Sequence, residues 1–161
     1  MISNKHILFL TLLSIFLSSD VKGQTDSIVD QLLGQGKELY YDGEYENAKK
    51  LFLEALSRKE DQSNPDSQLV VVYKRLGIVD RYLRLHRNAL ANYELGQSMA
   101  EQLYGFESEE VADFLFEIAS VYSQMYDPIK ANEYYSNCLK IYQSIYGEMS
   151  SQVGRTYMSI G

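Results

Sequence analysis

Residues 131–135 read Ala-Asn-Glu-Tyr-Tyr, and this stretch contains a pattern that organises most of the chain. An alanine followed four residues later by an aromatic residue also occurs at Ala89 with Tyr93 and at Ala48 with Phe52, so successive copies are 42 and 41 residues apart. Small residues stand twelve positions before and seven positions after these alanines, at Gly36, Gly77 and Ala119 and at Ala55, Gly96 and Cys138. The chain therefore consists of repeated units of about 42 residues, and this period decides the fold.

Each unit contains two predicted helices. Apolar residues recur every three or four positions, as at Val72, Leu76 and Val79, which is the spacing of one face of a helix. The same spacing continues through residues 111–125. Two prolines in 161 residues leave room for long uninterrupted helices. The sequence therefore predicts an all-α fold of helix pairs, in which the small residues allow the two helices of a pair to cross closely.

Turn and capping residues mark the ends of these helices. Asp42-Gly43-Glu44 separates the two helices of the first unit, with the glycine making the turn. Asp127-Pro128 is a helix start signal, because the aspartate caps free N–H groups and the proline lacks only an N–H that the first helical position leaves unpaired. We interpret Asn64-Pro65-Asp66 in the same way, as the start of the first helix of the second unit.

These residues resemble the tetratricopeptide repeat, a helix-turn-helix unit with a small residue midway along its first helix and alanine, aromatic and small residues along its second. The 42-residue period and the Tyr-Gly pair between units resemble the kinesin-light-chain variety. Arg84-Leu85-His86 departs from the Gly-Asp-Tyr usual in that position, and Asp80 stands where an aromatic residue is common. The motifs that carry the resemblance are Leu76-Gly77, Ala119-Ser120-Val121-Tyr122, Gly43-Glu44-Tyr45-Glu46-Asn47-Ala48 and Ala131-Asn132-Glu133-Tyr134-Tyr135.

The resemblance implies a right-handed solenoid of antiparallel helix pairs. We expect repeats at residues 24–63, 64–105 and 106–147, followed at 148–161 by the first helix of an incomplete fourth repeat. Gly161 falls on the small-residue position of that last helix. Because a repeat cannot bury its apolar face alone, we expect the gene to continue into further units.

Residues 1–23 are expected to be a signal peptide. An apolar run from Ile7 to Leu17 follows the basic Lys5 and precedes Val21-Lys22-Gly23, which offers small residues at the positions that a signal peptidase reads. The run is shorter than the roughly 20 apolar residues that span a bilayer. The sequence therefore predicts export, cleavage before Gln24, a periplasmic or extracellular location, and no membrane span in the mature chain.

Composition argues against several classes of function. The formal net charge of −7 has the wrong sign for a nucleic-acid-binding protein. Cys138 is the single cysteine and the two histidines lie far apart, so the sequence offers no metal-ligand spacing. Cys138 stands at a packed small-residue position and is interpreted as structural, and His86 has no nucleophile at catalytic spacing. We expect no catalytic residue, no cofactor and no metal.

After these exclusions, the remaining candidate for function is a binding surface. The resemblance implies that the first helices of the repeats line a concave face. The residues expected to face it are Asp30, Leu33, Lys37, Tyr40, Tyr41, Val71, Lys74, Ile78, Arg81, Tyr82, Asp113, Phe116, Ser120, Ser123 and Gln124. The predicted peptide-binding residues among them are Lys37, Tyr40, Lys74, Ile78, Arg81, Tyr82, Phe116, Ser120 and Gln124. Solvated charges on an ordinary helix surface are the alternative interpretation.

We therefore expect an exported, non-enzymatic scaffold that binds a protein or peptide. The expected ligand carries an acidic or C-terminal carboxylate group, met by Lys37, Lys74 and Arg81, and an apolar anchor, met by Tyr40, Tyr82 and Phe116. The alternative is the sensing or docking N-terminal region of a longer protein that ends in a CHAT protease-like or histidine kinase module. The reading frame downstream of Gly161 discriminates between the two.

Overall fold

The computed structural model of the chain describes residues 4–59 and 65–160, with side chains from residue 23 onward. These residues are helical and contain no strand, which confirms the all-α prediction for this part of the chain. The predicted signal peptide lies almost entirely outside the described side chains and stays a prediction. The helices are α1 (Asn4–Tyr41), α2 (Tyr45–Ser57), α3 (Ser67–Tyr82), α4 (His86–Tyr104), α5 (Glu109–Gln124), α6 (Pro128–Tyr146) and α7 (Ser151–Ile160).

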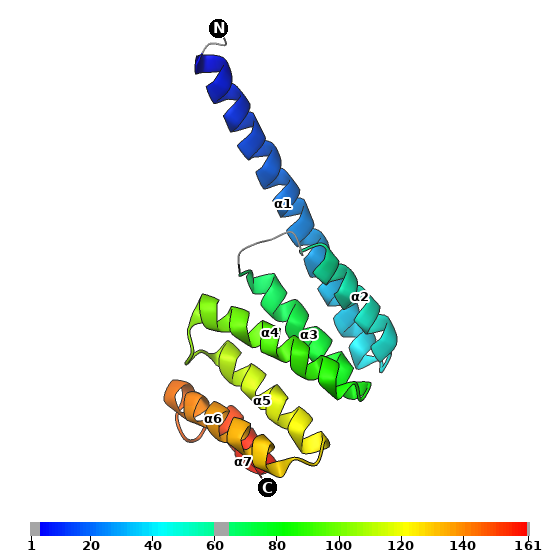
Figure 1. Ribbon diagram of the computed structural model, residues 1–161, viewed down its shortest axis with the longest axis vertical. Helices are drawn as coiled ribbons and strands as arrows, with labels where there is room; N and C mark the ends of the chain where they lie inside the picture. Colours follow the sequence, from blue (N-terminus) through cyan, green and yellow to red (C-terminus); the bar gives the residue numbers. More distant parts are fainter. Residues whose placement is uncertain (1–3, 60–64, 161) are drawn as a thin grey trace.

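The helices stack in chain order into a layered array (Figure 1). Helices α1 and α2, α3 and α4, and α5 and α6 form three pairs, each joined by a short turn, and α7 packs on α6. The second helix of each pair contacts the first helix of the next pair, and α1 contacts α3, which in turn contacts α5. The first helices of successive repeats therefore lie next to one another. In the described part of the chain, no helix combines the length and apolarity needed to cross a bilayer.

Helix starts follow capping chemistry, with one correction to the sequence analysis. Asp127 caps α6 by accepting a hydrogen bond from the Lys130 backbone N–H, and Pro128 occupies the first turn, as predicted. Before α3, however, the cap is Asp66, whose carboxylate accepts from the backbone N–H groups of Gln68 and Leu69. The predicted start at Pro65 is therefore wrong by two residues, because the aspartate after the proline satisfies the free donors. Asn64 lies outside the described residues.

The repeated small and aromatic residues meet inside each helix pair. A Cβ atom on Gly36 of α1 would overlap the ring of Phe52 on α2, and a Cβ atom on Gly77 of α3 would overlap the ring of Tyr93 on α4. Both rings are fully buried. The glycines are therefore required by close approach between the helices of a pair.

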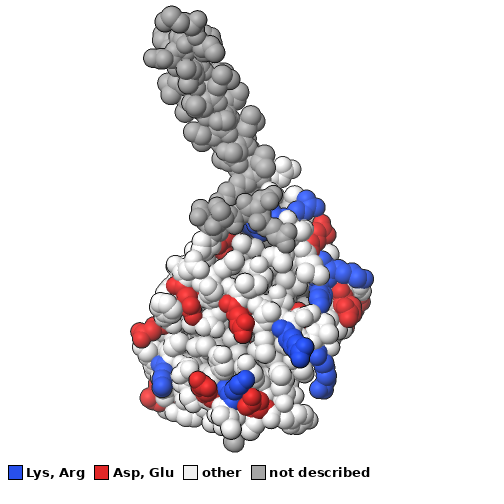
Figure 2. Space-filling view, in the orientation of Figure 1, with Lys and Arg blue, Asp and Glu red and all other residues white. Residues whose placement is uncertain are grey.

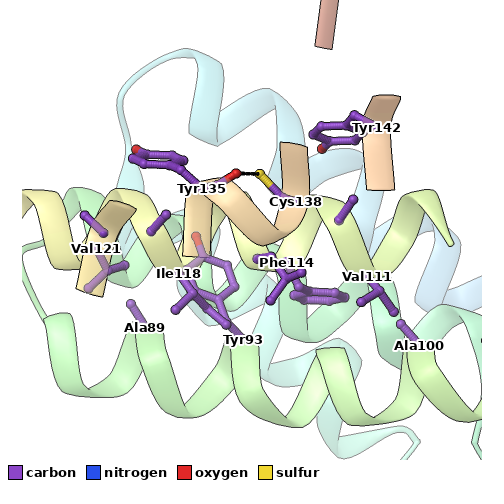
Figure 3. Close-up of a cluster of buried hydrophobic side chains, with 14 of the residues drawn as sticks. Ala89, Tyr93, Ala100, Val111, Phe114, Ile118, Val121, Tyr135, Cys138 and Tyr142 are labelled. Carbon is purple, nitrogen blue, oxygen red and sulfur yellow. Dashed lines mark hydrogen bonds between the residues drawn. The ribbon is translucent and has the colours of Figure 1, made fainter. Parts of the chain in front are cut away.

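The core of the second and third repeats forms around α5 (Figure 3). Phe114 and Ile118 of α5 lie between Tyr93 of α4 and the side chains of α6. Cys138 of α6 is fully buried and donates a hydrogen bond from Sγ to the backbone oxygen of Tyr135 at 3.2 Å. Burial raises the pKa of the Cys138 thiol to about 11, so the thiolate is scarce at neutral pH. This environment fits the structural interpretation of the cysteine.

A buried charge network closes the first repeat onto the second. Lys59, just beyond α2, is fully buried, and its Nζ lies 2.5 Å from Asp26 Oδ1 of α1 and 3.0 Å from Asp66 Oδ2. Burial on its own would lower the pKa of Lys59, but the hydrogen bonds to the two carboxylates outweigh burial and raise the pKa above its ordinary value. Since Asp66 also caps α3, one lysine connects α1, α2 and the start of α3.

We expect Gly36→Ala to destabilise the chain by about 1–3 kcal/mol, because the added methyl group overpacks the contact with Phe52. Gly34 lies on the same helix with open space around it, so Gly34→Ala is the matched control. There we expect a stabilisation of up to about 1 kcal/mol from the better helix propensity of alanine. Urea denaturation followed by circular dichroism measures both. Equal effects of the two substitutions would contradict the packing role of Gly36.

The Asp66 carboxylate gives a pH-dependent prediction. Burial raises its pKa, but the hydrogen bonds from Lys59 and the Gln68 N–H outweigh burial and lower it below the ordinary value. Its stabilisation is therefore present above a pH of about 4 and is lost as the pH falls through the folded-state pKa. Asp66→Asn keeps the cap but removes the charge, so the slope of the free energy of unfolding between about pH 5 and pH 2 should be smaller than in wild type by the contribution of this one carboxylate. Asp42→Asn, at an exposed position, should leave that slope unchanged.

Candidate functional site

Side chains of α1, α3, α5 and α7 interact with one another and with neighbouring helices across the repeats. We call this surface the first-helix face and define it by Lys37, Tyr40, Tyr41, Lys74, Arg81, Tyr82, Asp113, Phe116, Glu117, Ser120 and Arg155. It contains most of the residues that the sequence analysis assigned to the concave face. The assigned Ile78, like Phe116, is half-buried and packs against the core, and its role in binding stays a prediction.

Two ion pairs join α3 to α5. Lys74 pairs with Asp113, and Arg81 Nη2 lies 3.1 Å from Glu117 Oε2. Each carboxylate also accepts from a tyrosine hydroxyl of a second helix: Asp113 from Tyr142 at 2.5 Å and Glu117 from Tyr93 at 3.2 Å. Burial raises the pKa of both tyrosines, and the adjacent carboxylates raise it further. The phenols therefore stay protonated as donors, and the network fixes the second repeat against the third.

These ion pairs change the electrostatics expected from the sequence. Two of the three basic residues predicted to meet a ligand charge, Lys74 and Arg81, are already neutralised within the chain. The sequence analysis did not assign Glu117 to this face, although Glu117 follows Asp113 by four residues and so shares its side of the helix. Figure 2 shows acidic and basic side chains interspersed among uncharged ones on the face in view. The role of Lys74 and Arg81 in peptide binding stays a prediction.

A tyrosine cluster joins the first repeat to the second. The ring of Tyr82 stacks on Tyr45 at 4.9 Å between centroids and meets Tyr40 edge-on at 5.3 Å. Tyr41 packs beside Tyr40, with Lys37 Nζ 5.8 Å from its ring centroid. Tyr41 is 70% exposed and Tyr82 is 45% exposed, so the cluster offers aromatic surface to a partner.

Side chains of α5, α6 and α7 meet around Phe116. Its ring packs edge-on against Tyr135 at 5.3 Å, and the guanidinium of Arg155 lies 4.1 Å from its centroid. Ser120 Oγ lies 3.2 Å from the Tyr135 hydroxyl. Arg155 was not among the predicted residues, although it follows Asp113 by one 42-residue period. The repeat period itself was the signal that could have found it.

One shallow pocket of about 460 Å³ lies where α3 and α5 end. Four of its residues, Arg81, Tyr82, Ser123 and Gln124, were assigned to the concave face from the sequence. The other two, Arg84 and Tyr126, belong to the turns and were not assigned. The structure therefore brings together predicted residues of two repeats with two turn residues between them.

The remaining candidates for catalysis or metal binding do not form a common site. His86 begins α4 and lines a different pocket with Arg84, Arg87 and Met125. Glu109 and Glu110 lie in the first turn of α5, where Ser108 caps the helix, as expected for carboxylates that favour a helix N-terminus. Among the side chains that the structure describes, no three potential metal ligands cluster.

No protein-family model matches the chain, and a search of curated proteins finds no match. Solved structures do match. BtubC (BKLC) from P. vanneervenii superposes with a TM-score of 0.73 at 24% identity over 88% of this chain, and the chain spans 56% of that protein.

PcrH from Pseudomonas aeruginosa gives a TM-score of 0.63 at 19% identity, covering 83% of this chain and 89% of PcrH. PcrH in complex with the chaperone binding region of PopB gives a TM-score of 0.64 at 19% identity, covering 83% of this chain and 94% of PcrH. These neighbours are helical repeat proteins of the tetratricopeptide type. The described helices of this chain therefore form a tetratricopeptide-like repeat fold.

Proposed function

We propose that this chain is a protein-interaction scaffold that binds a peptide segment of a partner on its first-helix face. The tyrosine cluster carries the proposal, because aromatic side chains held in place by one another and partly open to solvent are typical anchors of binding energy. The fold adds support, since PcrH, which shares it, has been crystallised with a region of PopB.

The shape of the face favours a segment of chain over a small molecule. Its pockets are shallow and open, whereas sites for small ligands enclose most of the ligand surface. The interactions along it run from Lys37 in the first repeat to Arg155 in the fourth, so a bound segment would cross several repeats. Long, shallow surfaces of this kind suit peptide recognition.

The proposed segment carries an acidic or C-terminal carboxylate together with an apolar side chain. Lys37 is exposed beside Tyr41, so it is available for the charge. The apolar side chain would pack on Tyr41 and Tyr82, which are the more exposed rings of the cluster. Lys74 and Arg81 would contribute through the hydrogen-bonding capacity that their ion pairs leave unused.

The binding face is tested with a peptide selected from a displayed library of short random sequences. Tyr41→Ala should weaken binding of the selected peptide about tenfold, because the variant removes an exposed aromatic anchor. Phe106→Ala is the matched control, since Phe106 is 73% exposed in the loop between α4 and α5 and is not one of the residues that define this face. Isothermal titration calorimetry measures both affinities. Equal losses from the two variants, or no loss from Tyr41→Ala, would count against the first-helix face.

We further propose that the scaffold works outside the cytoplasm after residues 1–23 are removed. The support is the apolar run of residues 7–17 followed by Val21-Lys22-Gly23. Expression in a bacterial host, followed by intact mass measurement of the exported fraction, should give a chain that begins at Gln24. A full-length chain recovered only from the cytoplasm would contradict export.

A further inference from the structure

The three turns inside the helix pairs share one backbone geometry but not one residue type. Gly43, Arg84 and Tyr126 occupy equivalent positions, with φ of +79°, +59° and +59°. The next residue in each turn donates a hydrogen bond from its backbone N–H to a backbone oxygen in the last turn of the preceding helix. These bonds run from Glu44 to Leu39, from Leu85 to Asp80 and from Asp127 to Tyr122, at 2.8, 2.8 and 3.0 Å. Glycine adopts this left-handed conformation without a Cβ penalty, whereas arginine and tyrosine do so at a cost.

The side chains of Arg84 and Tyr126 contribute little to the packing of the fold. Both are exposed, and Tyr126 is 93% exposed. Gly43 makes the same turn without a side chain. A residue held in a disfavoured conformation without contributing to the core is a sign that its side chain serves another purpose.

Both side chains line the pocket of about 460 Å³ between the ends of α3 and α5. We call it the turn pocket, with lining residues Arg81, Tyr82, Arg84, Ser123, Gln124 and Tyr126. The lining contains two arginines and no carboxylate. Since Arg81 pairs with Glu117, Arg84 carries the positive charge of the pocket that no described carboxylate neutralises.

Arg81 retains hydrogen-bonding capacity in this pocket. Its Nη2 lies 3.1 Å from Glu117, but its Nε is buried and has no hydrogen-bond partner among the described residues. Nε is closed to solvent, so a ligand oxygen would meet the other guanidinium nitrogens of Arg81. The Ser123 hydroxyl and the Gln124 amide supply further donors.

We infer that the turn pocket binds a single carboxylate group of the partner segment, held by Arg81 and Arg84, with the adjacent apolar side chain resting on Tyr82 and Tyr126. The inference rests on the proposed function and names the chemistry and the place of recognition. The guanidinium fork matches a carboxylate. A single carboxylate fits better than a polyanion, because Glu117 already stands beside Arg81 and the chain as a whole is acidic.

The test uses small probes and nuclear magnetic resonance of the ¹⁵N-labelled chain. N-acetyl-Phe-Glu-amide should shift the amide signals of Ser123, Gln124 and Tyr126 saturably, with a Kd on the order of 1 mM. N-acetyl-Phe-Gln-amide, which has the same shape without the charge, should bind at least about tenfold more weakly. N-acetyl-Phe with a free carboxylate is the third arm, and comparing its Kd identifies whether a side-chain or a C-terminal carboxylate is the preferred source.

The double variant Arg84→Gly with Tyr126→Gly should raise the Kd of the acidic probe at least about tenfold. Its Tm should stay unchanged or rise by up to about 5 °C, because glycine relieves the left-handed strain. Arg87→Ala, which removes an exposed arginine of α4 outside the pocket lining, is the matched control and should leave the Kd unchanged.

Equal binding of the acidic and amide probes would overturn the inference, as would signal changes confined to residues outside the turn pocket. Unchanged affinity of the double-glycine variant, or a fall in its Tm of more than about 5 °C, would do the same. If the pocket tests fail while Tyr41→Ala still weakens the library-selected peptide, the carboxylate site is wrong and the peptide-binding scaffold stands. If the pocket tests fail and Tyr41→Ala also leaves binding of the library-selected peptide unchanged, the scaffold is rejected as well.

Discussion

Each of the first two helix pairs depends on one close contact, between a glycine of its first helix and an aromatic ring of its second. The rings of Phe52 and Tyr93 occupy the space that a Cβ atom on Gly36 or Gly77 would need. This contact sets how near the helices of a pair approach, and the approach sets which face of each pair remains for the next repeat. The stacking of the repeats, and therefore the alignment of α1, α3 and α5, follows from this packing constraint.

Buried charges then fix the repeats relative to one another. Lys49 of α2 lies 2.6 Å from the buried carboxylate of Asp80 on α3, which also accepts from Asn92 of α4 at 2.9 Å. The pair of Lys59 with Asp66 and the two ion pairs between α3 and α5 also cross from one repeat to the next, whereas Lys59 and Asp26 belong to the same repeat. Apolar packing tolerates small shifts between helices, whereas a buried ion pair requires its partners within hydrogen-bond distance. The register of the repeats is therefore specified by polar contacts in addition to the packing of the apolar core.

The same network distinguishes α3 and α5 from the turns that follow them, where the proposed pocket lies. Lys74 in the middle of α3 and Arg81 in its last turn both pair with carboxylates of α5. In the turns that follow, Arg84 and Tyr126 are exposed and line the pocket. The disfavoured backbone at Arg84 and Tyr126 lies in this region, in keeping with the general tendency of strained residues to gather at functional sites.

The repeat period alone determined the helix pairs, the packed position of Cys138 and the cap at Asp127, because these depend on local spacing that each repeat carries in its own sequence. The start of α3 was misplaced because Pro65 and Asp66 offer competing local signals, and the Lys59 network that engages Asp66 comes from a different part of the chain. Helical spacing indicated the side of α3 and α5 on which the candidate residues lie, but not their partners. Only the tertiary structure decided those pairings, because ion pairs between repeats and a pocket between two turns depend on the distance and rotation between helices, which no spacing within one helix contains.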